Sequence, residues 1–115
     1  MTLSEFEKKR CEKLAAEFVE KRRPPAHLRA KVDLAFRIAG QSVEIYEVRA
    51  HWREEGKILE QPIAKATYNK SKKSWKLYWH RADLKWHAYQ PHLEAASIEE
   101  FFYVIQEDSH GCFFG

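Results

Sequence analysis

Aromatic and basic residues are concentrated in one stretch of this 115-residue chain, between Trp75 and Tyr89. The stretch holds three of the four tryptophans and two of the five tyrosines, with Lys76, Arg81 and Lys85 between the rings. Flat rings stack on nucleobases and lysines neutralise phosphates, so such a surface suits a nucleic acid or another polyanion. The same residues are common on exposed antiparallel strands, where cross-strand pairs stabilise the sheet. The composition alone is compatible with both interpretations.

Strand periodicity divides this stretch into two faces. Residues 75–80 and 84–89 alternate apolar with polar side chains, which predicts two strands with one apolar face. The side chains predicted to point into the core are Trp75, Leu77, Trp79, Leu84 and Trp86. The side chains predicted to point outward are Lys76, Tyr78, His80, Lys85, His87 and Tyr89. With the preceding loop, the predicted nucleic-acid or polyanion site is Lys70, Lys72, Lys73, Lys76, Tyr78, Lys85 and Tyr89.

A carboxylate and an ammonium two residues apart, Asp83 and Lys85, suggest a second chemistry. On a strand they would share a face, and Glu47 on an earlier strand could approach them. Metal-dependent nucleases hold Mg²⁺ with carboxylates beside a lysine. The alternative function is therefore a metal-dependent phosphodiester hydrolase that uses Asp83, Lys85 and Glu47. A match of three residues is common by chance, and a turn aspartate beside a solvated lysine is the simpler interpretation.

Histidines and cysteines offer a third chemistry, which their spacing does not favour. The possible metal ligands are His80, His87, His92, His110 and Cys112. They match no zinc finger, knuckle or metalloprotease helix, so we predict no metal site and no cofactor. Cys112 lies between Gly111 and Phe113 and is predicted to pack as a small apolar residue. With Cys11 at the other end of the chain, free thiols in a reducing cytoplasm are expected.

Charge is distributed unevenly around a net value of +3. The segments 1–31 and 70–85 are basic, whereas the chain beyond Trp86 has five acids and no Lys or Arg. This pattern favours either mutually complementary segments or an external polyanion. The longest uncharged apolar run, residues 101–105, is far shorter than the roughly 20 residues that span a bilayer. Without a secretory signal pattern either, we expect a cytoplasmic protein with no membrane partner.

Helix signals occur at both ends of the chain. Ser4 and Glu7 have capping-box spacing, as do Thr2 and Glu5, and predict a helix from about Ser4 to Lys21. Its basic end, residues 21–23, could bind an anionic surface, although five glutamates favour an ordinary solvated face. A second capping box at 97–100 predicts a short helix along Ile98–Ile105, followed by a docked apolar tail.

Strands are predicted at 31–38, 43–52, 62–68, 75–80 and 84–89. Gly40 supplies the turn of the first hairpin. The apolar parity changes after Ile45, which predicts a bulge, and residues 53–61 are predicted to form a charged loop. The expected fold class is α+β, an antiparallel meander of about five strands with both helices on one face. We expect one domain, 1–115, with a helix at 1–23, the sheet at 24–90, and a helix with tail at 91–115.

Several motifs resemble a known family. They are Gly40-Gln-Ser-Val43, Glu47-Val-Arg49 with Trp52, Pro62-Ile-Ala-Lys65, Trp75-Lys-Leu-Tyr-Trp79 with Arg81-Ala-Asp-Leu-Lys-Trp-His87, and Gly111-Cys-Phe-Phe-Gly115. From about Pro24 to Gly115 the chain is similar to the bacterial domain-of-unknown-function family 3024. The resemblance implies a bacterial, cytoplasmic, stand-alone domain and supplies no activity, ligand or catalytic residue.

Three functions therefore follow as expectations. The first is a non-enzymatic binding module for nucleic acid or another polyanion, and the second is the metal-dependent hydrolase. The third is a protein–protein interaction domain that pairs through an open sheet edge, for example as a homodimer.

Overall fold

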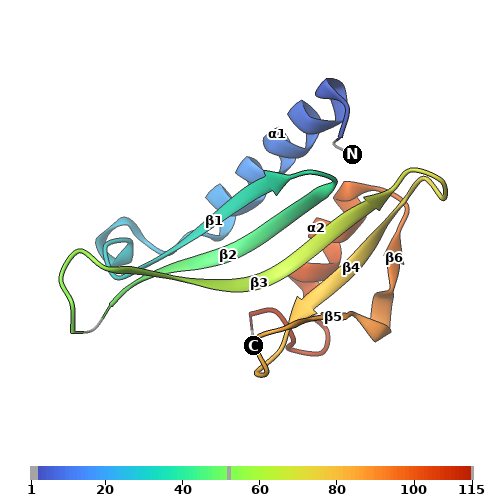
Figure 1. Ribbon diagram of the computed structural model, residues 1–115. Helices are drawn as coiled ribbons and strands as arrows, with labels where there is room; N and C mark the ends of the chain where they lie inside the picture. The colour runs from blue at the N-terminus through green and yellow to red at the C-terminus, as the bar shows by residue number, and fades with distance from the viewer. Residues whose placement is uncertain (1–2, 52, 115) are drawn as a thin grey trace.

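The computed structural model describes residues 3–51 and 53–114 (Figure 1). The elements in chain order are α1 (Glu5–Arg22), η1 (Ala26–Leu28), β1 (Val32–Ala39), β2 (Ser42–Ala50), β3 (Ile58–Asn69), β4 (Ser74–His80), β5 (Trp86–Ala88), η2 (Gln90–His92), β6 (Glu94–Ala95) and α2 (Ile98–Glu107). The predicted α+β class, with an antiparallel sheet and a helix near each end, is confirmed. Of the helices described, none combines the length and the apolarity needed to cross a bilayer.

The sheet is a meander in which β1 to β5 pair in sequence order, all antiparallel. Gly40, with a φ of 59°, closes the β1–β2 hairpin as predicted. The two-residue strand β6 pairs with β4. The sequence did not predict β6, because two residues are too few to show a period.

A serine hydroxyl caps the N-terminus of each α-helix. Ser4 Oγ accepts the Glu7 amide at 3.2 Å, and Ser97 Oγ accepts the Glu100 amide at 3.2 Å. The Glu100 carboxylate in turn accepts the amide of Ala96, one residue before the cap, so the reciprocal bond of the predicted capping box is shifted by one residue. The other predicted box begins at Thr2, which lies outside the described residues.

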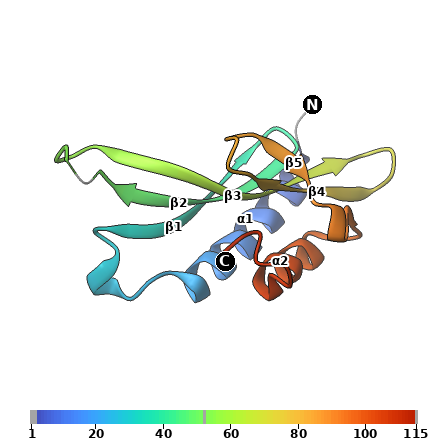
Figure 2. The same cartoon turned by 90° about the horizontal axis from the view of Figure 1, so that it is seen from below.

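Both helices cover the same face of the sheet (Figure 2). Phe18 of α1 stacks on Phe102 of α2 with ring centroids 5.2 Å apart. Beneath them, Ile45 and Leu77 of the sheet are fully buried. After α2 the chain returns to this core, where Phe113 packs on Tyr89 with centroids 4.8 Å apart. The predicted docking of the apolar tail is therefore confirmed.

The bulge occurs at the predicted level of the sheet but in a different strand. The β1–β2 ladder is uninterrupted, whereas the β2–β3 register shifts between Ile45 and Tyr46. Ile45 pairs with Ala64 and Tyr46 pairs with Pro62, so Ile63 of β3 is the extra residue. β3 also begins at Ile58, inside the predicted loop, because backbone pairing with β2 needs no buried face at this exposed end. The predicted end of the second strand, Trp52, lies outside the described residues.

The predicted orientation of the fifth strand is wrong. His80 pairs with Trp86 and Trp79 pairs with His87, and directly opposite residues share a face. His87 therefore lies on the helix-covered face and Trp86 on the other. The turn causes this inversion, because Leu84 adopts a φ of 64° and interrupts the alternation. Leu84 itself is 74% exposed, not part of the core.

The predicted outward position of Tyr89 is also wrong. Tyr89 is only 2% exposed, and its amide donates to the Leu77 carbonyl at 3.0 Å. Tyr89 has the parity of His87, so the same inversion of the strand turns it toward the helix-covered face. Its ring fills the space between the sheet and the docked tail.

We expect the burial of α2 to dominate stability. Replacing Phe101, which is fully buried, by alanine should lower the free energy of unfolding by about 3–5 kcal/mol. Tyr103 on the same helix is 65% exposed, and Tyr103→Ala should change it by less than about 0.5 kcal/mol. Urea denaturation measures both. Equal losses in the two variants would contradict this placement of α2.

An ion pair links the end of α1 to β1 and gives a pH-dependent prediction. Arg23 donates to both Asp33 carboxylate oxygens, at 2.9 and 2.7 Å. This hydrogen bonding lowers the pKa of Asp33. The stabilisation is thus complete above the unfolded-state pKa, near 3.9, and is lost as pH falls through the lower folded-state pKa.

Asp33→Asn should therefore reduce the free energy of unfolding by about 1 kcal/mol at pH 7. The difference from the unsubstituted protein should shrink as the pH is lowered below about 4. Urea denaturation between pH 2.5 and pH 7 tests this, and a pH-independent difference would argue against a charged Asp33.

Candidate nucleic-acid interface

In the described residues, neither helix covers the second face of the sheet, which we call the outer face (Figure 2). The strand register places one row of paired residues across it, from Arg37 through Glu44 and Lys65 to Tyr78. Around this row lie further outer-face residues, namely Tyr46, Thr67, Lys76, His80 and Trp86. Antiparallel sheets with one solvated face have polar residues there, but this face also carries three large rings.

Cations lie over each of these rings. The Arg37 guanidinium is 4.2 Å from the centroid of Tyr46. Lys65 Nζ lies 5.0 Å from the ring of Tyr78 and 4.8 Å from that of Trp86, so it bridges the two. Lys76 Nζ is 5.6 Å from Tyr78 as well. All four distances are within the roughly 6 Å range of a cation–π interaction.

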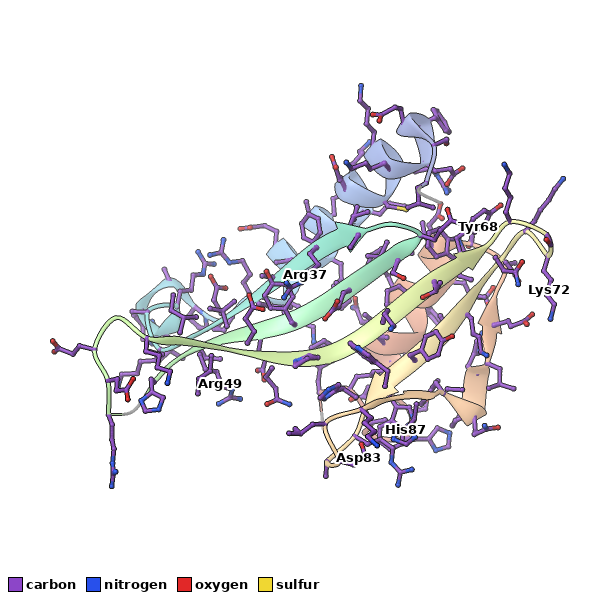
Figure 3. The ribbon with its side chains drawn as sticks, viewed as in Figure 1. Arg37, Arg49, Tyr68, Lys72, Asp83 and His87 are labelled. Carbon is purple, nitrogen blue, oxygen red and sulfur yellow. The ribbon has the colours of Figure 1, made fainter. Side chains whose placement is uncertain are left out.

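The electrostatic balance of the outer face is close to neutral. Arg37 donates to Glu60 at 2.6 Å, which raises its pKa, and lies 4.0 Å from Glu44 (Figure 3). Burial lowers the pKa of Lys65, and the neighbouring Glu44 opposes that effect. Arg37 is thus already neutralised by carboxylates, and the exposed Lys76 is the cation most available to an anion.

One polar atom on this face lacks a partner. The His80 ring meets Trp86 edge-on, with centroids 5.1 Å apart. Within the described part of the chain, His80 Nδ1 is buried without a hydrogen bond. Buried polar atoms are normally satisfied, and this nitrogen, which is inaccessible to solvent, is an exception.

The structure brings together only part of the predicted binding residues. Lys76 and Tyr78 lie side by side on the outer face. The loop before β4 holds Lys70, Lys72 and Lys73, and the turn after it holds Lys85. The seven residues of β4 separate these ends by roughly 20 Å. Lys72 is also engaged, because its ammonium lies 3.5 Å from Glu94.

Several residues of the outer face were not predicted from the sequence. Tyr46 and Lys65 join it through the register of β2 and β3, and Trp86 joins it through the turn before β5. The alternation within β3 predicts the face on which Lys65 lies. It does not predict which rings lie beside it. For Trp86, parity indicated the wrong face.

Asp83 and Glu47, the two carboxylates of the hydrolase alternative, form hydrogen bonds to different partners. Asp83 accepts the Lys85 amide at 3.0 Å and lies 2.7 Å from His87 Nε2, and this histidine lowers its pKa (Figure 3). Glu47 instead accepts from Arg49 at 3.1 Å. Among the described residues, no group of three or more His, Cys, Asp and Glu side chains is placed to hold a metal. The hydrolase therefore stays a prediction that this geometry does not favour.

The two thiols occupy different environments. Cys11 is fully buried in α1, and burial together with Glu7 raises its pKa to about 11. Cys112 in the tail is partly exposed, and burial and Asp108 raise its pKa as well. Raised values leave little thiolate at neutral pH, so neither residue has the character of an activated nucleophile.

We expect the two cysteines to react with a disulfide reagent at separate rates. Cys112 should be modified first and slowly at pH 7, and Cys11 only when the protein unfolds. Counting released thiolate before and after adding urea measures this, with Cys112→Ser to assign the first event. Two equivalents released from the native protein would contradict the burial of Cys11.

Comparison with known proteins gives one result. Neither a search of curated proteins nor a search of solved structures gave a match. The family model described as "Domain of unknown function (DUF3024)" matches residues 3–115. The match begins before Pro24, so it includes α1 as well as the sheet, and it confirms the resemblance seen in the motifs. The chain therefore belongs to the DUF3024 family.

Proposed function

We propose that this protein is a non-enzymatic binding module whose outer face binds single-stranded nucleic acid. The observation that supports the proposal is the group of three rings, Tyr46, Tyr78 and Trp86, each with a cation over it, on the face that the helices leave open. Nucleic-acid bases are flat and carry phosphates between them. A surface of rings and cations complements both properties.

Stacking supplies most of the affinity in this proposal. Each base that stacks on an exposed ring contributes about 1–3 kcal/mol. Tyr78 and Trp86 are neighbours, because both lie within 5.0 Å of Lys65 Nζ. Two successive bases can therefore use adjoining rings, while Lys76 contacts a phosphate.

The charge balance distinguishes a single-stranded nucleic acid from other polyanions. Glu44 and Glu60 offset much of the positive charge of the outer face. A polyanion without flat rings, such as heparin, gains little from such a surface. We expect binding with a shallow salt dependence, because few phosphates are neutralised.

Removal of the central ring is the first test. Tyr78→Ala should weaken binding of a fluorescein-labelled oligo(dT) or oligo(U) about 5- to 150-fold, equivalent to the roughly 1–3 kcal/mol of one stacked base. Tyr103→Ala on α2 removes an exposed tyrosine from the opposite side of the molecule and serves as the matched control. Fluorescence anisotropy gives both affinities. Equal weakening in the two variants, or no binding at all, would overturn the proposal.

Removal of a single cation is the second test. Lys76→Ala should lower the slope of log affinity against log salt by about one unit, as expected for one lost phosphate contact. Lys13→Ala, which removes a lysine from α1, should leave the slope unchanged. If heparin binds as tightly as the oligonucleotide, charge alone explains binding and the nucleic-acid assignment fails. Cleavage in Mg²⁺ that Asp83→Ala abolishes would support the hydrolase instead.

A further inference from the structure

The strand β1 has one edge without a partner strand. β1 ends the sheet order, so in the described residues it pairs only with β2. The two-residue loop of the first hairpin makes Ala39 and Ser42 a hydrogen-bonded pair. Backbone hydrogen bonding alternates along an antiparallel pair, so Leu34, Phe36 and Ile38 direct their amides and carbonyls to the free edge.

Contacts at both ends leave a short window on this edge. At the first end, Asp33 accepts the outward Leu34 amide at 2.8 Å and is itself held by Arg23. At the other end, the Leu3 amide donates to the Gly40 carbonyl at 3.1 Å, where the N-terminal segment meets the strand. Among the residues that the structure describes, the edge is therefore left open along residues 36–38, which is enough for a short extended segment.

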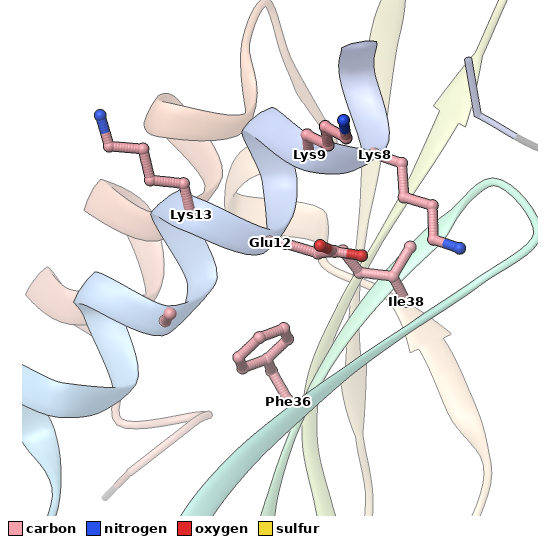
Figure 4. Close-up of a pocket in the computed structure, with 7 residues that line it drawn as sticks. Lys8, Lys9, Glu12, Lys13, Phe36 and Ile38 are labelled. Carbon is pink, nitrogen blue, oxygen red and sulfur yellow. The ribbon is translucent and has the colours of Figure 1, made fainter. Parts of the chain in front are cut away.

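A groove between α1 and β1 runs beside this window (Figure 4). It has a volume of about 750 Å³ and is open to solvent. Phe36 and Ile38 form an apolar floor, and residues of α1 line the opposite wall. That wall consists of Lys8, Lys9, Glu12, Lys13 and Ala16. Three lysines against one glutamate make it positively charged.

We propose that this groove binds an acidic peptide segment in extended conformation, which adds a strand to β1. The peptide backbone pairs with the free groups of Phe36 and Ile38, as in other cases of strand addition. Apolar side chains of the peptide cover Phe36 and Ile38, and its carboxylates meet the lysines of α1. The combination of free backbone groups, apolar floor and basic wall specifies both the conformation and the charge of the ligand.

Charge favours this ligand over a second copy of the chain. Pairing two β1 edges around a two-fold axis would bring two lysine-rich walls together, and like charges at close range are destabilising. An acidic peptide meets the same walls with opposite charge. The site is also separate from the outer face, because α1 lies on the helix-covered side of the sheet (Figure 2). Peptide binding in this groove therefore does not depend on nucleic-acid binding at the outer face.

The test uses a fluorescein-labelled, acetylated heptapeptide of sequence Glu-Thr-Val-Thr-Val-Thr-Glu, called the Glu–Val peptide. Its odd positions share one strand face, so both valines and both glutamates can face the groove. Fluorescence anisotropy should show binding that weakens with salt, and a Lys–Val peptide of the same length should bind at least about tenfold more weakly. Versions of the Glu–Val peptide with N-methyl groups on alternate residues, in both frames, remove the donors that pair with β1. At least one frame should lose binding. If both bind like the parent peptide, or the Lys–Val peptide binds equally well, strand addition to a basic groove is refuted.

Variants of the protein locate the site. Lys9→Glu combined with Lys13→Glu should weaken binding of the Glu–Val peptide about tenfold, whereas Lys21→Glu, outside the groove on the same helix, should have little effect. Hydrogen exchange read by NMR provides a second measurement that does not require a variant to fold. The Phe36 and Ile38 amides should exchange rapidly in the free protein and slowly with peptide. Unchanged exchange with saturating peptide, or a dimer in sedimentation with both amides already protected, would overturn the proposal.

Discussion

Packing of α1 and α2 against one face of the sheet is the interaction on which the other features depend. The stacked rings of Phe18 and Phe102 join the two helices over Ile45 and Leu77, and burial of apolar surface is the main force that holds such layers together. Because both helices occupy one side, the sheet keeps a second face in solvent. The chain therefore has a core on one face of a single layer of strands and a partly exposed aromatic surface on the other.

Two ligand-accessible surfaces result, and they differ in their physical character. The outer face presents side chains, with rings such as Tyr78 beneath lysines, so its chemistry is stacking with modest charge. The edge of β1 presents backbone groups beside a basic helix wall, so its chemistry is strand pairing guided by charge. The sheet lies between the two surfaces, so the two proposed ligands would not compete for the same residues.

The sequence predicted those features that depend on periodicity and local signals. Ser4 and Ser97 marked the helix starts, and the alternation of Trp75, Leu77 and Trp79 identified the buried face of β4. It did not predict the orientation of Trp86, because a single left-handed residue in a turn reverses strand parity and many residue types can adopt it. The outer face was found only in part, since cross-strand neighbours such as Lys65 and Trp86 depend on register, which no local pattern specifies.

The most direct test of the central claim is NMR observation of aromatic side chains during titration with a short oligo(dT). The account predicts that ring signals of Tyr46, Tyr78 and Trp86 shift together as bases stack on them. Signals of Trp75 and Tyr89, which are 3% and 2% exposed beneath the helices, should stay in place. Shifts confined to α1, α2 or the loop lysines, or no shifts at all at saturating oligonucleotide, would contradict the assignment of the outer face as the binding surface.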